Sequence, residues 1–199
     1  MIEHPLELDY TCSPVGIDEA GRGPMAGPLV VAGVVFPYGY ENDQLDDSKR
    51  LTEKKRESLF SLIQQEALWY KIVYVDEATI DRKNIYAATQ DAMFEIAQNA
   101  PTDLVLTDAM KLPGCIKEVH PIIKGDHKSI SIAAASILAK VSRDHTMMEL
   151  DRKYPQYGFA KHKGYPTKAH KEALKQYGPC PCHRHSYRPV RELEEIKLF

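Results

Sequence analysis

Two adjacent carboxylates, Asp18 and Glu19, end a short apolar run and are followed by the turn Gly21-Arg22-Gly23. Carboxylate oxygens are the ligands that hard divalent cations prefer in proteins. Glycines allow backbone amides to approach a ligand closely, and Arg22 adds a fixed positive charge. A lone Asp-Glu pair is common on exposed turns, so the pair has to be judged with its surroundings. The combination indicates a metal-dependent site that acts on a phosphate-bearing substrate.

Two further aspartates, Asp108 and Asp126, each follow a short apolar run closely. Either one alone is more typical of a surface or helix-capping residue. Ligands of α/β proteins bind outside the ends of strands, so carboxylates at several strand ends can share one site. The joint pattern predicts that both aspartates complete the site begun by Asp18 and Glu19.

The donor set indicates which ions would bind. Successive side chains of a strand point to opposite faces, so Asp18 and Glu19 serve one ion only if one of them reaches from the turn. Otherwise two ions are present. Hard oxygen donors favour Mg²⁺ or Mn²⁺ over zinc. Two such ions, ~4 Å apart, can hold both the attacking and the leaving oxygen of a phosphoryl displacement.

The elements that position these residues are predicted from apolar periodicity and from capping residues. Strands are expected over 15–17, 29–36, 68–75, 104–106 and 119–123, and helices over 52–67, 78–99, 130–150 and 167–177. The first half of the helix at 130 is almost wholly apolar or small, which predicts burial against a sheet. Two strands in a hairpin, followed by strands that alternate with helices, indicate a mixed sheet with helices on its faces.

Length and composition bound the class of protein. A chain of 199 residues with 43% hydrophobic residues suits one domain, with or without a C-terminal extension. The first residues lack the basic and apolar regions of a signal peptide, and no later stretch is apolar enough to span a membrane. We therefore expect a cytoplasmic protein that does not enter a membrane.

The cysteines are few and unevenly spread, which fits a reducing compartment and not a disulfide framework. The segment Cys180-Pro-Cys182-His183-Arg-His185 contains donors of the kind that bind zinc. One residue separates the two cysteines, however, and no distant pair of ligands accompanies them. The spacing therefore argues against a zinc site.

Charge is distributed unevenly along the chain. Residues 140–191 contain twelve Lys or Arg and four Asp or Glu, whereas residues 1–139 contain thirteen and twenty-one. A basic segment beside an acidic site suits an enzyme that cuts a polyanion, because phosphates need cations while metal ions need carboxylates. The alternative is a solvated helical surface.

Several long motifs follow one another along the chain. They are Gly16-Ile-Asp-Glu-Ala-Gly-Arg-Gly-Pro24, Lys124-Gly-Asp126, Ile132-Ala-Ala-Ala-Ser-Ile-Leu-Ala-Lys-Val141 with Arg143-Asp144, His162-Lys-Gly-Tyr165-Pro, and His183-Arg-His-Ser-Tyr-Arg-Pro-Val190. Together and in this order, they resemble the motifs of the ribonuclease HII family over essentially the whole chain. The chain departs from the family at Cys180 and Cys182, where other residues occur, and at Tyr187, where phenylalanine is more usual.

The resemblance implies an α/β fold, namely a ribonuclease H-like mixed five-stranded sheet flanked by helices, with a helical C-terminal extension. It implies a single domain over 1–199, in which 151–199 form a basic, helical substrate-binding part. The implied enzyme is a monomeric endonuclease that hydrolyses the RNA strand of RNA-DNA hybrids. It also nicks duplex DNA 5′ to embedded ribonucleotides by two-metal-ion catalysis, as in ribonucleotide excision repair, and leaves 3′-hydroxyl and 5′-phosphate ends.

The resemblance also implies roles for particular residues. The carboxylates that are catalytic and bind Mg²⁺ or Mn²⁺ would be Asp18, Glu19, Asp108 and Asp126. Gly21, Arg22 and Gly23 would read the ribose 2′-hydroxyl, and Lys49 would contact phosphate. Tyr165 would lie against the sugars at the RNA-DNA junction, where a ring with a hydroxyl can both pack on deoxyribose and bond the 2′-hydroxyl.

Three alternatives stay open at this point. Ribonuclease HIII shares the acid pair but has a long N-terminal domain, whereas fifteen residues precede Gly16 here, which disfavours it. A non-catalytic RNA-DNA hybrid-binding protein would use the basic segment and keep the acids as structure. A metal-dependent DNA exonuclease would need a similar set of carboxylates.

Overall fold

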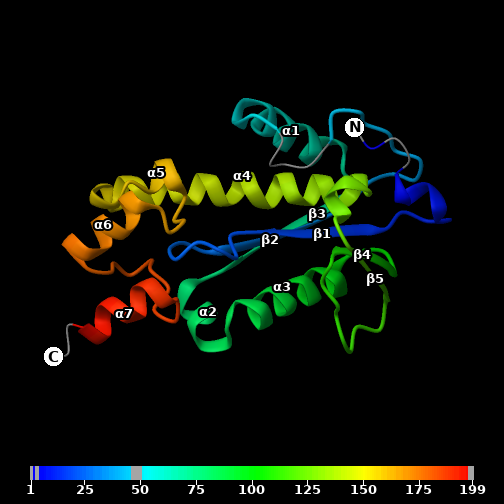
Figure 1. Ribbon diagram of the computed structural model, residues 1–199. Coiled ribbons are helices and arrows are strands. Elements are labelled where there is room, and N and C mark those ends of the chain that lie inside the picture. The colour runs from blue at the N-terminus through cyan, green and yellow to red at the C-terminus, as the bar shows by residue number, and fades with distance from the viewer. Residues whose placement is uncertain (1, 3–4, 46–50, 197–199) are drawn as a thin grey trace. The chain divides into compact units, whose positions relative to one another are not determined.

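A computed structural model describes residue 2 and residues 5–45 and 51–196; Lys49 lies outside the described residues. These residues form five strands, seven α-helices and three short 3-10 helices (Figure 1). In chain order they are η1 (Leu6–Asp9), β1 (Val15–Ala20), β2 (Leu29–Val35), α1 (Glu53–Glu66), β3 (Trp69–Val75), α2 (Glu77–Lys83), α3 (Ile85–Asn99), β4 (Leu104–Asp108), β5 (Glu118–Ile122), η2 (Gly125–His127), α4 (Ile130–Lys153), η3 (Pro155–Tyr157), α5 (Phe159–His162), α6 (Lys168–Tyr177) and α7 (Arg188–Ile196). None of the described helices is long and apolar enough to cross a membrane.

The strands form one mixed sheet in the order β3-β2-β1-β4-β5. β1 pairs with β2 in the antiparallel sense and with β4 in the parallel sense, and β4 pairs with β5 in the parallel sense. The predicted mixed five-stranded sheet is therefore confirmed. Because β1 lies in the middle of this order, residues at its end have neighbours from strands on both sides.

The chain divides into two compact units, each built from separate stretches of sequence. The first contains the described residues of 1–20, 30–73 and 89–141, and the second those of 21–29, 74–88 and 142–199. The first unit therefore holds most of the sheet, and the second holds the residues from Ser142 onward. A single domain with its substrate-binding part at 151–199 stays a prediction.

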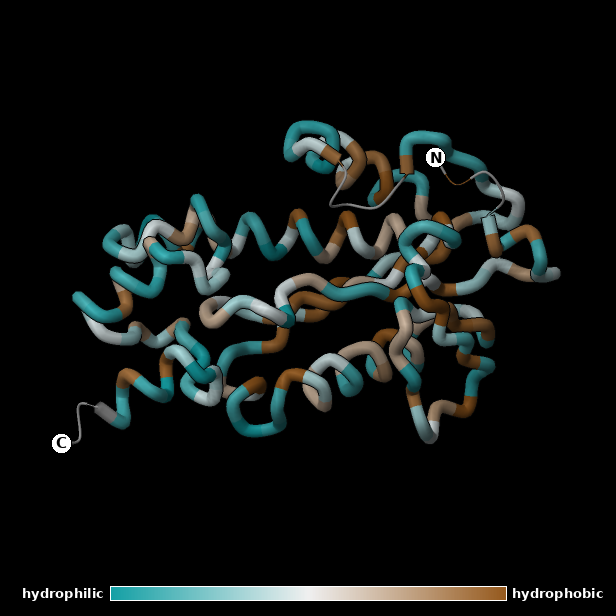
Figure 2. The backbone as a smooth tube through the Cα atoms, viewed as in Figure 1, coloured by the Kyte–Doolittle hydropathy of each residue, from teal (hydrophilic) through white to brown (hydrophobic). Residues whose placement is uncertain are grey.

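Helices cover both faces of the sheet in the first unit. A Cβ at Gly16 of β1 would lie 2.2 Å from the carbonyl carbon of Ser131 in α4, and one at Gly33 of β2 would lie 2.3 Å from the side chain of Ile96 in α3. Both glycines therefore let a helix approach a strand closely. Figure 1 shows α3 and α4 along opposite faces of the sheet, and Figure 2 shows hydrophobic residues concentrated along the central strands.

The start of α4 is held by a residue from the N-terminal segment. Glu7 in η1 accepts hydrogen bonds from Ser129 Oγ at 2.5 Å, from the Ile130 amide at 3.2 Å and from the Ser131 amide at 2.9 Å. The first amides of a helix have no partner within the helix, and a carboxylate there also interacts favourably with the helix dipole. Glu7 thus helps to cap α4, together with Ser129, whose hydroxyl accepts from the Ile132 amide at 3.1 Å.

Two expectations about helices were wrong. The helix expected over 78–99 is divided into α2 and α3 at Asn84, whose φ is 68°. The Asn84 side chain accepts a hydrogen bond from the Ala87 amide at 3.0 Å, so this residue ends one helix and caps the next. A further helix, α7, follows the one that was expected to be last. Its Pro189 lies near the N-terminus, where proline is tolerated.

Candidate active site

The first candidate site lies at the ends of two neighbouring parallel strands in the first unit. Asp18 and Glu19 belong to β1, and Asp108 is the last residue of β4. The pairing between β1 and β4 ends at Ile17 and Thr107, and Asp18 and Asp108 are the next residue of each strand. The structure therefore places these two carboxylates at the same edge of the sheet, as predicted from the strand ends.

The environment of Asp18 strongly perturbs its carboxyl group. Its side chain is buried, with 5% of the residue exposed. Burial, followed by the negative charges of Glu19 and Asp108, raises the pKa of Asp18 well above its usual value. Hydrogen bonds from the Glu19 amide, at 2.7 Å, and from the Ser136 side chain oppose this rise. The site therefore concentrates negative charge where little water is available to solvate it.

Asp126 is joined to this edge through the backbone. It lies in η2 and is 4% exposed. The amide of the preceding residue, Gly125, donates a hydrogen bond to Oδ1 of Asp108 at 2.9 Å. The segment that carries Asp126 is thus attached to the end of β4. His127 Nε2 lies 3.9 Å from an oxygen of Asp126.

The type of donor in this site suits a hard divalent cation, whereas the carboxylate oxygens are farther apart than the ligands of one bound ion. Their oxygens are the donors that Mg²⁺ and Mn²⁺ prefer, and a cation would offset the repulsion around Asp18. Within the described ranges, however, no three of these carboxylates bring an oxygen each to within 4.8 Å of one another. The donor set fits the ions, and binding would draw the side chains together.

The second candidate site is the turn Gly21-Arg22-Gly23 with Tyr165, all in the second unit. A Cβ on Gly23 would lie 3.5 Å from Cε1 of the Tyr165 ring, so the ring is next to the turn. Tyr165 is 46% exposed, and Arg22 and Gly23 are also exposed. The structure therefore brings together the residues expected to read a ribose and leaves Arg22, Gly23 and Tyr165 open to solvent, whereas Gly21 is buried.

Two buried arginines hold this turn from beneath. Arg143 donates to the carbonyl oxygens of Pro28, Ala26 and Lys163 at 2.9, 3.1 and 2.9 Å. Arg184 donates to those of Gly27, Gly21 and Arg22. Burial lowers the pKa of Arg143 to about 10 and lowers that of Arg184 as well. Both buried guanidinium groups therefore stabilise the backbone conformation of residues 21–28 by hydrogen bonds to its carbonyl oxygens.

Sequence reasoning missed the supporting residues. Ser136 was assigned only to the small-residue run that packs on the sheet, although its hydroxyl bonds Asp18. Gly125 was noted only as part of a motif. It acts through its backbone amide, which donates to Asp108, and residue type does not indicate such a contact. Arg184 stood in a motif without an assigned role. The available signal for Arg184 was that no acidic residue lies near it in the sequence to pair with its charge.

A mixed sheet of this strand order, with a buried Asp18 and a half-buried Asp108 where the pairing of its adjacent parallel strands ends, defines the ribonuclease H-like class of enzymes. The model of the ribonuclease HII family matches residues 15–190, and the chain belongs to this family. It is therefore an endoribonuclease that acts on the RNA strand of RNA-DNA hybrids.

Individual relatives agree with this assignment. A ribonuclease HII of Francisella tularensis subsp. mediasiatica (strain FSC147) is 54% identical over 181 residues, which are 90% of this chain and 97% of the relative. The crystal structure of the ribonuclease H2 from Pyrococcus horikoshii OT3 has a TM-score of 0.79 at 29% identity, covering 92% of this chain and 98% of that one. Bst-RNase HIII in complex with Mn²⁺ has a TM-score of 0.70 at 18% identity, covering 96% and 72%, and shares the fold.

Proposed function

We propose that Asp18, Glu19, Asp108 and Asp126 bind two divalent ions, Mg²⁺ or Mn²⁺, and that the enzyme also nicks duplex DNA 5′ to embedded ribonucleotides. The products are a 3′-hydroxyl and a 5′-phosphate. The observation that carries this proposal is the burial of Asp18 beside the charges of Glu19 and Asp108. Such a cluster is costly unless cations neutralise it, and strand ends are where ligands of α/β folds bind.

The carboxylates have separate tasks. The four carboxylates would hold two ions, which when bound would supply an activated water and stabilise the departing oxygen. Asp18, held by the hydroxyl of Ser136 and the amide of Glu19, keeps a fixed orientation toward the strand ends. Asp108 is oriented by the Gly125 amide. Fixed ligands reduce the reorganisation that reaction requires, because the charges face the reacting phosphate beforehand.

Selection of a ribonucleotide is assigned to the second unit. The backbone of Gly21-Arg22-Gly23, which is exposed at Arg22 and Gly23, would bond the 2′-hydroxyl, and the Tyr165 ring beside Gly23 would pack on the adjacent sugar. The 2′-hydroxyl is the group that distinguishes RNA from DNA at a given position. Exposed basic residues within 151–199, together with Lys49, would contact phosphates without sequence preference.

The cofactor, the compartment and the oligomeric state are also part of the proposed function. A divalent cofactor agrees with the Mn²⁺ complex of Bst-RNase HIII, a protein that shares this fold. We further propose that the enzyme acts in the cytoplasm, as a monomer, in ribonucleotide excision repair. Its four cysteines are free thiols, which fits a reducing compartment.

A cleavage assay on three matched duplexes tests the proposal. One contains a single ribonucleotide in DNA, one is a long RNA-DNA hybrid, and one is all DNA. With Mg²⁺ or Mn²⁺, we expect a nick on the 5′ side of the single ribonucleotide and no cut in the all-DNA duplex. Equal cutting of the all-DNA duplex would favour an exonuclease or other DNA nuclease. Binding without a nick under any metal would favour a hybrid-binding protein.

A further inference from the structure

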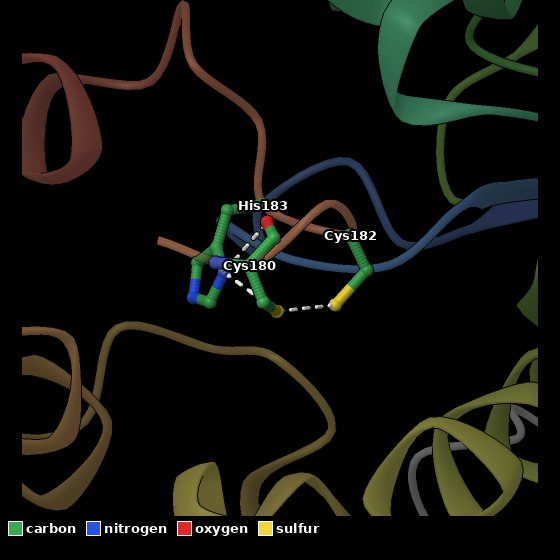
Figure 3. Close-up of side chains that lie close together, drawn as sticks. All are labelled: Cys180, Cys182 and His183. Atoms are coloured by element: carbon green, nitrogen blue, oxygen red, sulfur yellow. Dashed lines mark hydrogen bonds between the residues drawn. The ribbon is translucent and has the colours of Figure 1, made fainter. Parts of the chain in front are cut away.

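Two cysteines and a histidine lie together in the second unit, apart from the residues assigned above. Cys180 Sγ is 3.1 Å from Cys182 Sγ and 3.1 Å from His183 Nδ1 (Figure 3). All three residues are buried, with exposures of 8%, 5% and 0%. Within the described part of the chain, this is the one group of three or more His, Cys, Asp or Glu whose ligand atoms all lie within 4.8 Å of one another.

The three donors come from a single tight turn. The amide of His183 donates to the carbonyl of Cys180 at 2.9 Å, which closes a turn around Pro181 and Cys182. The sequence argument against zinc assumed that a site needs two separate pairs of ligands. Here the turn itself folds the first, third and fourth residues of Cys180-Pro-Cys-His183 toward one point, and no distant pair is needed to gather three ligands.

Hydrogen bonds select the ring nitrogen of His183 that can bind a metal. His170 Nδ1 lies 2.9 Å from the carbonyl oxygen of Tyr165, so this nitrogen carries the proton and donates. His170 Nε2 is then an acceptor, and His183 Nε2, at 3.1 Å, must donate to it. The lone pair of His183 is therefore on Nδ1, which faces Cys180 and accepts from its amide at 3.0 Å. Metal-binding histidines are commonly fixed in this way by a partner on the opposite ring nitrogen.

The surroundings favour a dication. The two cysteines pack in an apolar cluster with Ala26, Met147, Tyr157 and Phe159. Thiolates select soft or borderline ions, and an M²⁺ ion with two thiolates and a neutral imidazole has no net charge, which suits an apolar site. Tetrahedral Zn²⁺ needs ligand atoms about 3.5–3.8 Å apart, as follows from Zn–S and Zn–N distances of about 2.3 and 2.0 Å. The present separations would have to open by roughly half an ångström.

We propose that Cys180, Cys182 and His183 bind one Zn²⁺ ion, with a fourth coordination position outside this set. The residue after the site is Arg184, whose guanidinium holds the carbonyls of Gly21 and Gly27. An ion that fixes the turn at 180–183 would therefore also fix Arg184, which anchors the turn at 21–23. This site shares no residue with the carboxylate site and uses ligands of a different chemical class.

Titration of the reduced, metal-free protein with Co²⁺ tests the proposal. Co²⁺ replaces Zn²⁺ in tetrahedral sites and gives a sulfur-to-cobalt charge-transfer absorption that carboxylate ligands do not produce. We expect this band to saturate at one equivalent and to disappear when Zn²⁺ is added. One equivalent of Zn²⁺ should also raise the Tm, because an ion that binds the folded state stabilises it.

Cysteine variants locate the ion. Cys180→Ser and Cys182→Ser should each lose the band, whereas the double variant Cys12→Ser/Cys115→Ser should keep it, because those cysteines lie elsewhere. The wild-type titration decides the question even if a variant fails to fold. Absence of the band in wild-type protein that retains four reduced thiols would overturn the proposal. So would two titratable thiols in place of four, which would indicate a Cys180–Cys182 disulfide, or a band that survives both serine variants.

Discussion

Arg184 donates from both Nε and Nη2 to one acceptor, the carbonyl oxygen of Gly27, at 3.0 and 2.7 Å. Its Nη2 also donates to the carbonyl of Gly21 at 2.7 Å. A planar fork of fixed donors is what allows one side chain to hold two ends of a loop. The segment from Gly21 to Gly27 is therefore closed over a single buried guanidinium.

Replacing this arginine should destabilise the protein. Arg184→Lys keeps the charge but loses the fork, and leaves buried carbonyls without donors, so we expect a loss of about 2–4 kcal/mol in the free energy of unfolding. Urea unfolding measures the change. Arg188→Lys is the matched control because Arg188 is exposed on α7, and its effect should stay within ~0.5 kcal/mol. Equal losses in both variants would contradict this role for Arg184.

Asp18→Asn separates catalysis from substrate binding. We expect cleavage to fall by more than ~100-fold, the scale of a lost key electrostatic contact, while affinity for the hybrid changes little. In the presence of a chelator, the same variant should have a higher Tm, because it removes a buried charge beside Glu19 and Asp108. Each kcal/mol of repulsion relieved corresponds to about 2–4 °C.

The control for Asp18→Asn is Glu118→Gln, which removes an exposed carboxylate at the opposite end of β5. Cleavage should be unchanged in this control. Normal turnover by Asp18→Asn would remove Asp18 from the metal site, and a lower Tm in chelator would contradict the account of charge repulsion.

Tyr165→Ala should affect junctions more than long hybrids. Its ring lies next to Gly23 and is partly exposed, so its loss should lower cleavage at a single ribonucleotide by roughly 10-fold, about 1.4 kcal/mol. A long hybrid offers many alternative positions and should be affected less. Tyr86→Ala, at another exposed tyrosine, should change neither rate. An equal loss on both substrates would argue against junction reading.

The two glycines of the substrate turn should respond differently to alanine. Gly21 has a φ of 101°, and a Cβ there would lie 2.2 Å from Nε of Arg143, so Gly21→Ala should cost more than ~2 kcal/mol of stability. Gly23 has room for a methyl group, so Gly23→Ala should change stability by less than ~0.5 kcal/mol. If the turn reads the 2′-hydroxyl, Gly23→Ala should still impair cleavage. Unimpaired cleavage by a normally folded Gly23→Ala would weigh against that reading.

The cap of α2 gives a prediction about pH. Asp76 accepts from the Thr79 amide at 2.7 Å, and hydrogen bonds from Thr79 lower the pKa of Asp76. Because the folded-state pKa is lowered, the charge stabilises the fold above the unfolded-state pKa, and this contribution is lost as pH falls through the folded-state value. Asp76→Ala should cost about 1 kcal/mol at pH 7.

Asp76→Asn isolates the contribution of charge, because asparagine caps without titrating. The difference in unfolding free energy between wild type and Asp76→Asn should therefore shrink between pH 7 and pH 3. A difference that stays constant over this range would show that the carboxylate charge does not contribute.

Local signals in the sequence predicted much of the fold. The apolar run at 29–36 gave β2, and Thr52 was correctly expected to cap α1. Strand ends also indicated which carboxylates share an edge. The break between α2 and α3 at Asn84 was not predicted, because the apolar periodicity continues through it. Only the backbone conformation of Asn84 interrupts the helix.

Contacts between distant residues could not be predicted in the same way. Arg184 bonds backbone atoms some 160 positions earlier, and backbone acceptors leave no trace in residue type. The proximity of Cys180, Cys182 and His183 depends on the conformation of one turn, which Cys-Pro-Cys-His does not dictate by itself. The resemblance to a family supplied the roles of Gly21–Gly23 and Tyr165, and these roles stay predictions.

The cap that Glu7 provides for α4 also bears on the order in which the chain folds. The residues it joins are 122 or more positions apart, so the contact can form only after most of the chain has been synthesised and the loop between them has closed. Until then the first amides of the helix that carries Ser136 have no carboxylate partner. Removal of the first seven residues deletes Glu7 and should therefore fray the start of this helix. The measurement is hydrogen exchange, which should become faster at the amides of Ile130 and Ser131.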